Sequence, residues 1–322
     1  MKKVVLLMRK ISLFVLSMAL LVGFALPAMA AGNDQQKDLK KNEIKMDKEL
    51  SIYQFDDGRI EKVKDYSKLS DQQKNKILLE MKFTQEDIAG MSSILKDQFL
   101  SIGGYKVDTS VKKTKIYTDK DGTNHEFTSN NGSEINTLIN SETKQAQANS
   151  SEISTMSSVT DGIFSANSWV VFQGLTSNGA EYEYRMVTRY VWNGRPGVAF
   201  TDTIAHSYQS HSTRYQTNMS RHTWASPSNI ISNYQMSMSY PSAYATFGDI
   251  DLLYVDGLQE GYLNESVRIP TRHYGETGAF AAGYAHPYSS SLVRAALASA
   301  SISWDSTWGM KHNWLYYWTI GQ

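Results

Sequence analysis

Apolar and polar residues alternate along residues 181–193, and this is the clearest structural pattern in the chain. One set of alternate positions is mostly large and apolar, comprising Tyr182, Tyr184, Met186, Tyr190 and Trp192. The other set carries charge, at Glu181, Glu183, Arg185 and Arg189. Successive side chains of a strand point to opposite faces, so the spacing predicts a strand whose aromatic face is buried. Ser177-Asn178-Gly179 is a hairpin-turn sequence that connects this strand to an earlier one at Trp169–Gly174.

The same alternation, interrupted by turn residues, continues to the end of the chain. It predicts strands at Val198–Tyr208, Thr213–Trp224, Ile231–Tyr240, Ile250–Val255, Tyr262–Ile269, Gly278–His286, Leu292–Trp304 and Asn313–Ile320. The alanines that follow Leu292 also permit a helix, but serines alternating with apolar residues favour a strand there. Roughly ten strands at this spacing predict an antiparallel all-β, sandwich-like C-terminal domain over residues 161–322.

Apolar residues three or four positions apart predict a helical hairpin at about residues 70–102. Ser70 and Gln73 form a capping-box sequence at the start of the first helix. The second helix is expected to begin at Thr84 and to end at Gly103-Gly104. Its apolar stripe consists of Ile88, Met91, Leu95 and Phe99. The two helices are expected to pack against each other as a small helical region.

The segments around these helices are shorter and more polar. Residues 31–50 are charged and predict a flexible tail, and residues 51–63 predict a short hairpin around Asp57-Gly58. A second hairpin is expected from strands at Val111–Thr118 and Thr123–Phe127.

Serine, threonine, asparagine, glutamine and glutamate dominate residues 128–160, which predicts a linker containing at most one short helix, around Ile135, Leu138 and Ile139. The predicted organisation is therefore a charged N-terminal region at 31–127, a polar linker at 128–160 and the β domain. The fold class is α+β.

Residues 1–30 have the organisation of a signal peptide. Lys2, Lys3, Arg9 and Lys10 precede an apolar run that ends at Pro27 and an Ala28-Met29-Ala30 cleavage motif. That run has about 16 residues, fewer than the roughly 20 that a membrane-spanning helix requires. We therefore expect a bacterial protein that is secreted, as an extracellular or cell-wall-associated chain beginning at Ala31.

The composition excludes several classes of function. The chain has no cysteine, which rules out disulfides, thiolate nucleophiles and zinc–sulfur sites. Its formal net charge is zero, so no overall field attracts nucleic acid. The lysines are concentrated before about residue 158, whereas all seven tryptophans and only one lysine follow it. This break supports the division between the two regions.

The candidate chemical groups form no recognised catalytic signature. His206, His211 and His222 are close in sequence, and a metal site would require three such ligands around one ion. Asp249 and Asp251 share a strand face, with Asp256 in the next turn, and could serve hydrolysis or bind calcium. The histidines are more simply explained as isolated residues without a common ligand, and the aspartates as part of a solvated strand edge and turn. We therefore expect no catalytic residues, no metal and no cofactor, and the chain is not expected to be an enzyme.

The C-terminal aromatic residues are the preferred binding candidates. Trp314, Tyr316 and Trp318 share one strand face, and Trp308 falls in the turn before them. Exposed aromatic rings suit sugar rings or a lipid headgroup layer, whereas buried ones would form a core. The sequence thus predicts a secreted, non-enzymatic binding protein whose partner is a polysaccharide or cell-envelope surface. A membrane-active pore-forming protein, a secreted hydrolase and an extracellular matrix or coat protein are the alternatives.

Overall fold

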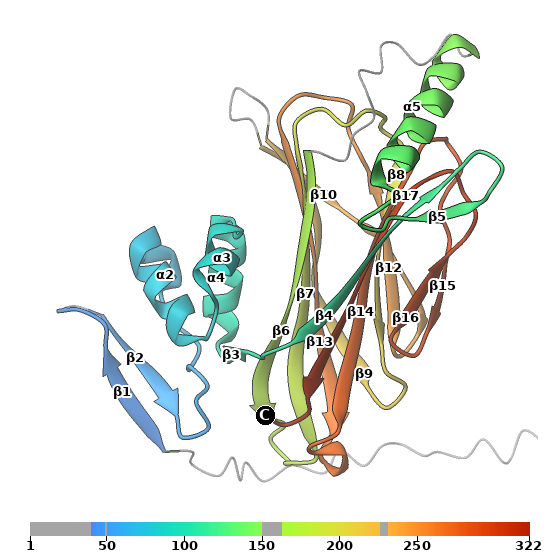
Figure 1. The fold of residues 1–322 in the computed structure, drawn as a ribbon. Coiled ribbons are helices and arrows are strands. Elements are labelled where there is room, and N and C mark those ends of the chain that lie inside the picture. The colour runs from blue at the N-terminus through green and yellow to red at the C-terminus, as the bar shows by residue number, and fades with distance from the viewer. Residues whose placement is uncertain (1–39, 49, 150–162, 226–230) are drawn as a thin grey trace, which may run out of the picture. The chain divides into compact units, whose positions relative to one another are not determined.

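The computed structural model describes residues 40–48, 50–149, 163–225 and 231–322, and it consists mostly of antiparallel strands with few helices (Figure 1). Residues 38–322 form one compact unit. The predicted leader lies outside the described residues. No helix among those that are described is both long and apolar enough to cross a membrane.

The N-terminal region begins with a two-stranded sheet and continues with three short helices. Strands β1 (Lys41–Lys45) and β2 (Ser51–Phe55) pair in antiparallel register, so part of the expected flexible tail is a strand. Helix α2 (Asp71–Glu80) begins at the predicted capping box, in which the Gln73 N–H donates to Ser70 Oγ over 3.3 Å. The second predicted helix is instead two, α3 (Gln85–Ala89) and α4 (Ser93–Ile102). Gly90 ends the first and Ser92 caps the second.

Six strands form the first large sheet. Their order is β10 (Ile231–Gln235), β9 (Thr213–Ala225), β13 (Leu258–Pro270), β7 (Glu181–Asn193), β6 (Phe164–Leu175) and β3 (Tyr105–Lys106).

Seven strands form the second large sheet. Their order is β11 (Ser237–Ser242), β12 (Ala245–Asp251), β8 (Thr201–Tyr208), β14 (Thr277–Pro287), β17 (Gly309–Thr319), β4 (Ser110–Thr118) and β5 (Asn124–Glu126). The strand predicted at residues 231–240 is therefore two strands in different sheets. The one predicted at 292–304 is a hairpin of β15 (Ala295–Ala298) and β16 (Ser301–Trp304).

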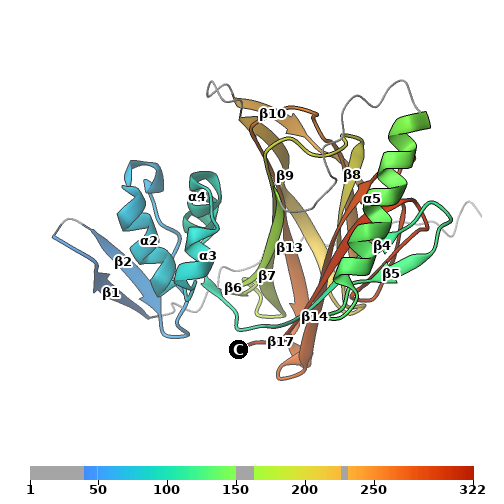
Figure 2. The same ribbon diagram turned by 45° about the horizontal axis from the view of Figure 1, so that its top comes forward.

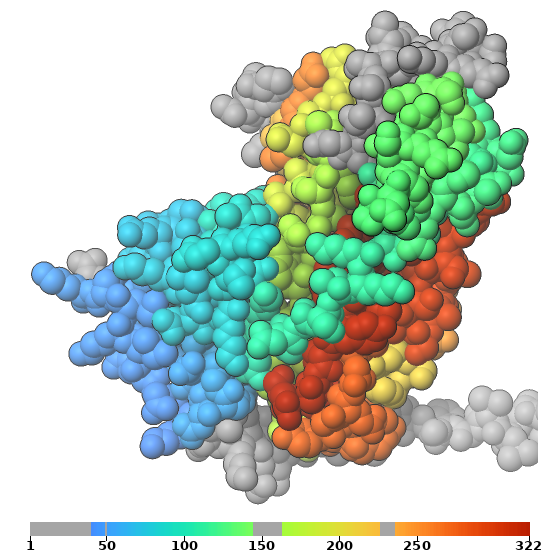
Figure 3. Space-filling view, viewed as in Figure 1, coloured from blue at the N-terminus to red at the C-terminus, as the bar shows by residue number. Residues whose placement is uncertain are grey.

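Strands from before the predicted linker belong to both large sheets. β3 pairs with β6, and β4 pairs with β17 along nine residue pairs. Figure 3 shows β4 (cyan-green) alongside β17 (red). The part of the linker that the structure describes contains α5 (Gly132–Asn149), which lies beside the second sheet (Figure 2). Its buried residues Ile135 and Ile139 pack with Tyr117 and Met310 of that sheet. A boundary at 128–160 remains a prediction, but the sheets draw strands from both sides of it.

The main core lies between the two sheets. Tyr184, Met186, Tyr190 and Trp192 of β7 are buried in it, as their alternation predicts, and Tyr182 is half-buried at its margin. Trp192 Nε1 donates a 2.9 Å hydrogen bond to the Tyr284 hydroxyl of the opposite sheet. The aromatic face therefore joins the two sheets by packing and by a polar contact.

Part of the opposite face of β7 is covered rather than solvated. Val187 and Trp169 join a second apolar cluster with the N-terminal helices, and Trp169 Nε1 donates to Asp87 over 2.8 Å. Arg189 donates to the Gly90 carbonyl at 2.5 Å and pairs with Glu260 at 2.7 Å. Arg189 is consequently a half-buried structural link, although its place on the charged face gave it the pattern of a surface residue.

Small residues allow the β15–β16 hairpin to lie against the second sheet. Ala205 and Ala281 form a cluster with Ile302, and Trp304 packs at its edge. A Cβ on Gly283 would lie 2.7 Å from the Trp304 ring. Larger residues on this face would exclude the hairpin, because interiors have little free volume.

Candidate functional site

One edge of the two large sheets combines exposed aromatic rings with a buried charged group. It is formed by β9 and β11, and the chain passes from the first sheet to the second at Met236, which is buried. The Thr213–Ser220 part of β9 pairs with β13, whereas β10 pairs only with residues 221–225. β11 is the outermost strand of the second sheet. We call this region, Thr213–Ser220 together with β11, the β9/β11 edge.

Two tyrosines of this edge are exposed and stacked on arginines. Tyr215 is 57% exposed, and the Arg268 guanidinium carbon lies 3.6 Å from its ring centroid. Tyr240 is 46% exposed, and Arg214 lies 4.1 Å from its ring centroid. Arg268 is itself paired with Glu183 at 2.9 Å. Each guanidinium covers one ring face and holds the ring in place, because its charge is attracted to the π cloud.

A buried carboxylate lies beneath the same edge. Glu265, on the inward face of β13, accepts hydrogen bonds from Thr217 of β9 (2.9 Å) and Thr246 of β12 (2.8 Å) at one oxygen. Its other oxygen accepts from the Tyr208 hydroxyl and faces His206 Nδ1 at 3.0 Å. Glu265 therefore connects β9 to strands of the opposite sheet.

The electrostatics of this group are set by its hydrogen bonds. Burial by itself raises the pKa of Glu265, but the hydrogen bonds from His206, Tyr208 and Thr246, together with the charge attraction to His206, bring that pKa below its usual value. The pKa of Tyr208 is raised, first by burial and then by the Glu265 charge. The carboxylate is thus ionised at neutral pH inside the sheets.

Polar contacts, rather than apolar packing, hold β9 to the core. Among the described residues, no side chain of β9 belongs to the main apolar core between the sheets. Thr217 bonds to Glu265, and the Arg214 Nε atom lies 3.9 Å from the same carboxylate. The pairing of β9 with β13 also shifts register twice, at Asn264/Glu265 and at Ser266/Val267. These bulges interrupt the ladder beside the anchor residue.

The C-terminal aromatics predicted to bind a ligand are mainly core residues. Trp314, Tyr316 and Trp318 lie on the inward face of β17 and are buried between the sheets. Trp308 is half-buried, donates its Nε1–H to Tyr117 over 2.7 Å and has Lys120 over its ring at 4.8 Å. An exposed stacking row is thus absent from the described part of β17, because the face that carries these rings is the one facing the core.

The remaining candidates are distributed over separate places. His206 lies beside Glu265, and His222 faces the Tyr190 hydroxyl at 2.7 Å, both buried. Asp249 and Asp251 accept hydrogen bonds from Thr203 and Thr201 of β8, each over 3.2 Å. These contacts serve strand pairing.

Burial raises the pKa of Asp249. Asp256 pairs with Arg195 at 2.6 Å, in an exposed turn. Of the three predicted histidines, His211 is the one that belongs to a three-residue group of metal-ligating side chains within the described part of the chain, together with His273 and Glu276.

Comparison with known proteins adds little. No protein-family model and no curated protein matches the sequence. A collagen-binding domain of a Staphylococcus aureus adhesin is 6% identical, with 39% of this chain and 86% of that chain covered and a TM-score of 0.25. The Clostridium perfringens NetB toxin in its membrane-inserted form is 6% identical, with 48% and 91% covered and a TM-score of 0.27. A DUF4466 family protein from Parabacteroides merdae is 13% identical, with 43% and 44% covered and a TM-score of 0.21. Scores this low support no argument about function.

Proposed function

We propose that this is a secreted, non-enzymatic protein that binds an extracellular or cell-envelope polysaccharide through its β9/β11 edge. The observation that supports the proposal is the pair of arginine-backed tyrosines. Tyr215 and Tyr240 each have one face held by a guanidinium and about half of the side chain exposed. A fixed, amphipathic ring binds a sugar face at low entropic cost, since little side-chain freedom remains to be lost.

Binding to insoluble glycans tests this function. Cellulose, chitin and peptidoglycan sacculi are incubated with the mature protein, and the bound fraction is measured against glycan concentration. The Tyr215→Ala/Tyr240→Ala variant should bind at least about fivefold more weakly, because two aromatic contacts of about 0.5–1.5 kcal/mol each are removed. Tyr53→Ala is the matched control, because Tyr53 is equally exposed at 46% on β2, away from this edge. Unchanged binding by the double variant, or no glycan binding by the natural chain, contradicts the proposal.

The polar attachment of β9 supports a second function, membrane activity through release of the segment that contains β9. β9 has no side chain in the main core, so its release leaves that core's apolar packing intact; Met219 is its contact with the apolar cluster of the N-terminal helices. We propose that such release would let polar, alternating strands line a pore.

A disulfide lock tests this second function, and the cysteine-free chain makes the experiment clean. Gln216 and Ser266 are direct cross-strand partners on β9 and β13. Cα atoms of such partners lie about 4.5–5.5 Å apart, within disulfide range. The reduced Gln216→Cys/Ser266→Cys variant should release dye from lipid vesicles, and its oxidised form should not. If the natural chain releases no dye, or if the oxidised variant releases it equally, β9 release is refuted.

A further inference from the structure

Two loops at one end of the sheets bring together metal-ligating side chains. His211 lies in the turn between β8 and β9, whereas His273 and Glu276 lie in the connection from β13 to β14. β8 and β14 are antiparallel neighbours, with Tyr208 opposite Phe280. The end of β8 therefore lies beside the start of β14, and this pairing places the two loops together.

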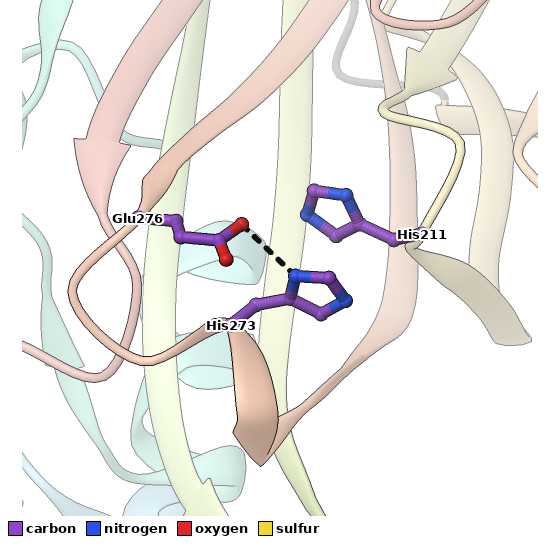
Figure 4. Close-up of side chains that lie close together, drawn as sticks. All are labelled: His211, His273 and Glu276. Atoms are coloured by element: carbon purple, nitrogen blue, oxygen red, sulfur yellow. Dashed lines mark hydrogen bonds and ion pairs between the residues drawn. The ribbon is translucent and has the colours of Figure 1, made fainter.

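The three side chains converge on a common space. The two imidazole rings are stacked, with centroids 4.0 Å apart and planes at 13°. His273 Nδ1 lies 2.9 Å from Glu276 Oε2, and one donor atom from each residue lies within 4.8 Å of the others. Figure 4 shows the Glu276 carboxylate directed at the His273 ring, with the His211 ring stacked over it. Ligands of a tetrahedral ion with bonds of 2.0–2.1 Å lie about 3.4 Å apart, so a shift of about 1 Å closes the set.

Gln209 orients one ring nitrogen of His211. The amide oxygen of Gln209 accepts the Ala279 N–H at 2.6 Å, which fixes the orientation of the amide. The amide nitrogen of Gln209 then faces His211 Nε2. An amide nitrogen is a donor, so His211 Nε2 must present a lone pair. A metal ion bound at Nε2 would replace the Gln209 amide nitrogen on this lone pair.

His273 supplies an independent sign of a missing partner. Its Nδ1 faces Glu276, while its Nε2 is buried and has no hydrogen-bond partner among the described residues. Leaving such a nitrogen unsatisfied is destabilising.

We propose that His211, His273 and Glu276 form a three-ligand site for a divalent transition ion of the zinc class. Two imidazole nitrogens and one carboxylate oxygen match the borderline preference of Zn²⁺, whereas Ca²⁺ requires six to eight oxygen ligands. Three protein ligands leave a coordination position open. The site reaches the surface, because the Glu276 side chain is 55% exposed. That position can therefore accept water or an oxygen or nitrogen donor of a partner.

Calorimetric titration of the EDTA-treated mature protein with ZnCl₂ tests the site. We expect one Zn²⁺ per chain, a rise in melting temperature with added Zn²⁺ because the ion binds the folded state, and no response to equal concentrations of CaCl₂ or MgCl₂. His211→Ala and His273→Ala should each weaken Zn²⁺ binding at least tenfold. His125→Ala should not, because His125 pairs with Asp119 at 2.8 Å in a different part of the fold.

Two further outcomes decide the proposal. Glu276→Gln alters an exposed side chain, so it should fold normally and still weaken Zn²⁺ binding, even if a histidine variant unfolds. Absence of Zn²⁺ binding to the natural chain, or full binding by a folded Glu276→Gln or His211→Ala variant, would overturn the site.

Discussion

Replacing Glu265 by glutamine should destabilise the protein and remove part of its acid sensitivity. The carboxylate has hydrogen-bond contacts with four groups, two at each oxygen, from Thr217, Thr246, Tyr208 and His206. Glutamine keeps the shape but turns one oxygen into a donor, which the threonine hydroxyls can accept by rotating. The variant loses stability because hydrogen bonds to a charged carboxylate become weaker bonds to a neutral amide. Part of this loss is offset because burying an amide costs less desolvation energy than burying a carboxylate. We expect the variant to lose about 2–4 kcal/mol at pH 7.

The sign of the pH dependence follows from the lowered pKa of Glu265. The unfolded chain takes up a proton near the ordinary value of 4.5, whereas the folded chain resists protonation to lower pH. The stabilisation by Glu265 is therefore fully present above about pH 4.5 and is lost progressively as the pH falls through the folded-state pKa. The gap in unfolding free energy between the natural chain and Glu265→Gln should consequently narrow on acidification.

Urea unfolding followed by far-UV circular dichroism between pH 3 and pH 7 measures both effects. Glu183→Gln is the control, since Glu183 is a half-exposed residue on the outer face of β7. It should cost less than about 1 kcal/mol. Equal stability of the natural chain and Glu265→Gln at pH 7, or a gap that stays constant down to pH 3, would refute the anchoring role of the carboxylate.

Four other outcomes can be measured directly. Trp192→Ala should cost about 3–5 kcal/mol in urea unfolding, because the ring is buried and bonded across the sheets. Arg189→Ala should also cost more than about 1 kcal/mol, since it leaves Glu260 unpaired under the helices. In Gly261→Ala the new Cβ would lie 2.1 Å from the buried Tyr190 ring, so a melting temperature within experimental error of the natural chain would disprove the packing at this position. The intact mass of the secreted protein should correspond to a chain that begins at Ala31, and a mass that includes residues 1–30 would disprove export with cleavage.

Most strands could be predicted because period two is a local signal. β7, β9 and β14 lie close to their predicted ranges. The errors fall where tertiary contacts decide. The strand predicted at 231–240 changes sheets at Met236, and the one predicted at 292–304 reverses direction around Ala300, which has a φ of 46°. Neither event alters the alternation of side chains, so the pattern alone does not reveal it.

The sequence also does not show which part of the outer face of β7 is covered by another element. Glu183 and Arg189 occupy the same face of β7, yet one is half-exposed and the other bonds to the Gly90 carbonyl of the N-terminal helices. Whether a charged face meets water or another element depends on packing between segments far apart in the chain.

The candidate sites were missed for related reasons. The signal for Glu265 was present, since it lies between Leu263 and Val267 at the parity of core residues. A glutamate in that register has to find buried partners, but only the folded chain shows that they come from β8, β9 and β12. The sequence analysis grouped His211 with His206 and His222 because they are close in sequence. In the structure, the pairing of β8 with β14 instead places His211 beside His273.

Glu265 also separates the two functions proposed for the β9/β11 edge. If the edge binds glycan as a fixed surface, weakening the anchor should lower the affinity, because Arg214 and Tyr215 lie on the strand that Glu265 holds. If the segment containing β9 acts after release, the same change should increase dye release from vesicles at neutral pH, since the released state becomes easier to reach. Glu265→Gln should therefore shift the two assays in opposite directions. A variant that binds glycan less well and leaves vesicles intact supports the fixed binding surface, whereas increased leakage with unchanged glycan binding supports release.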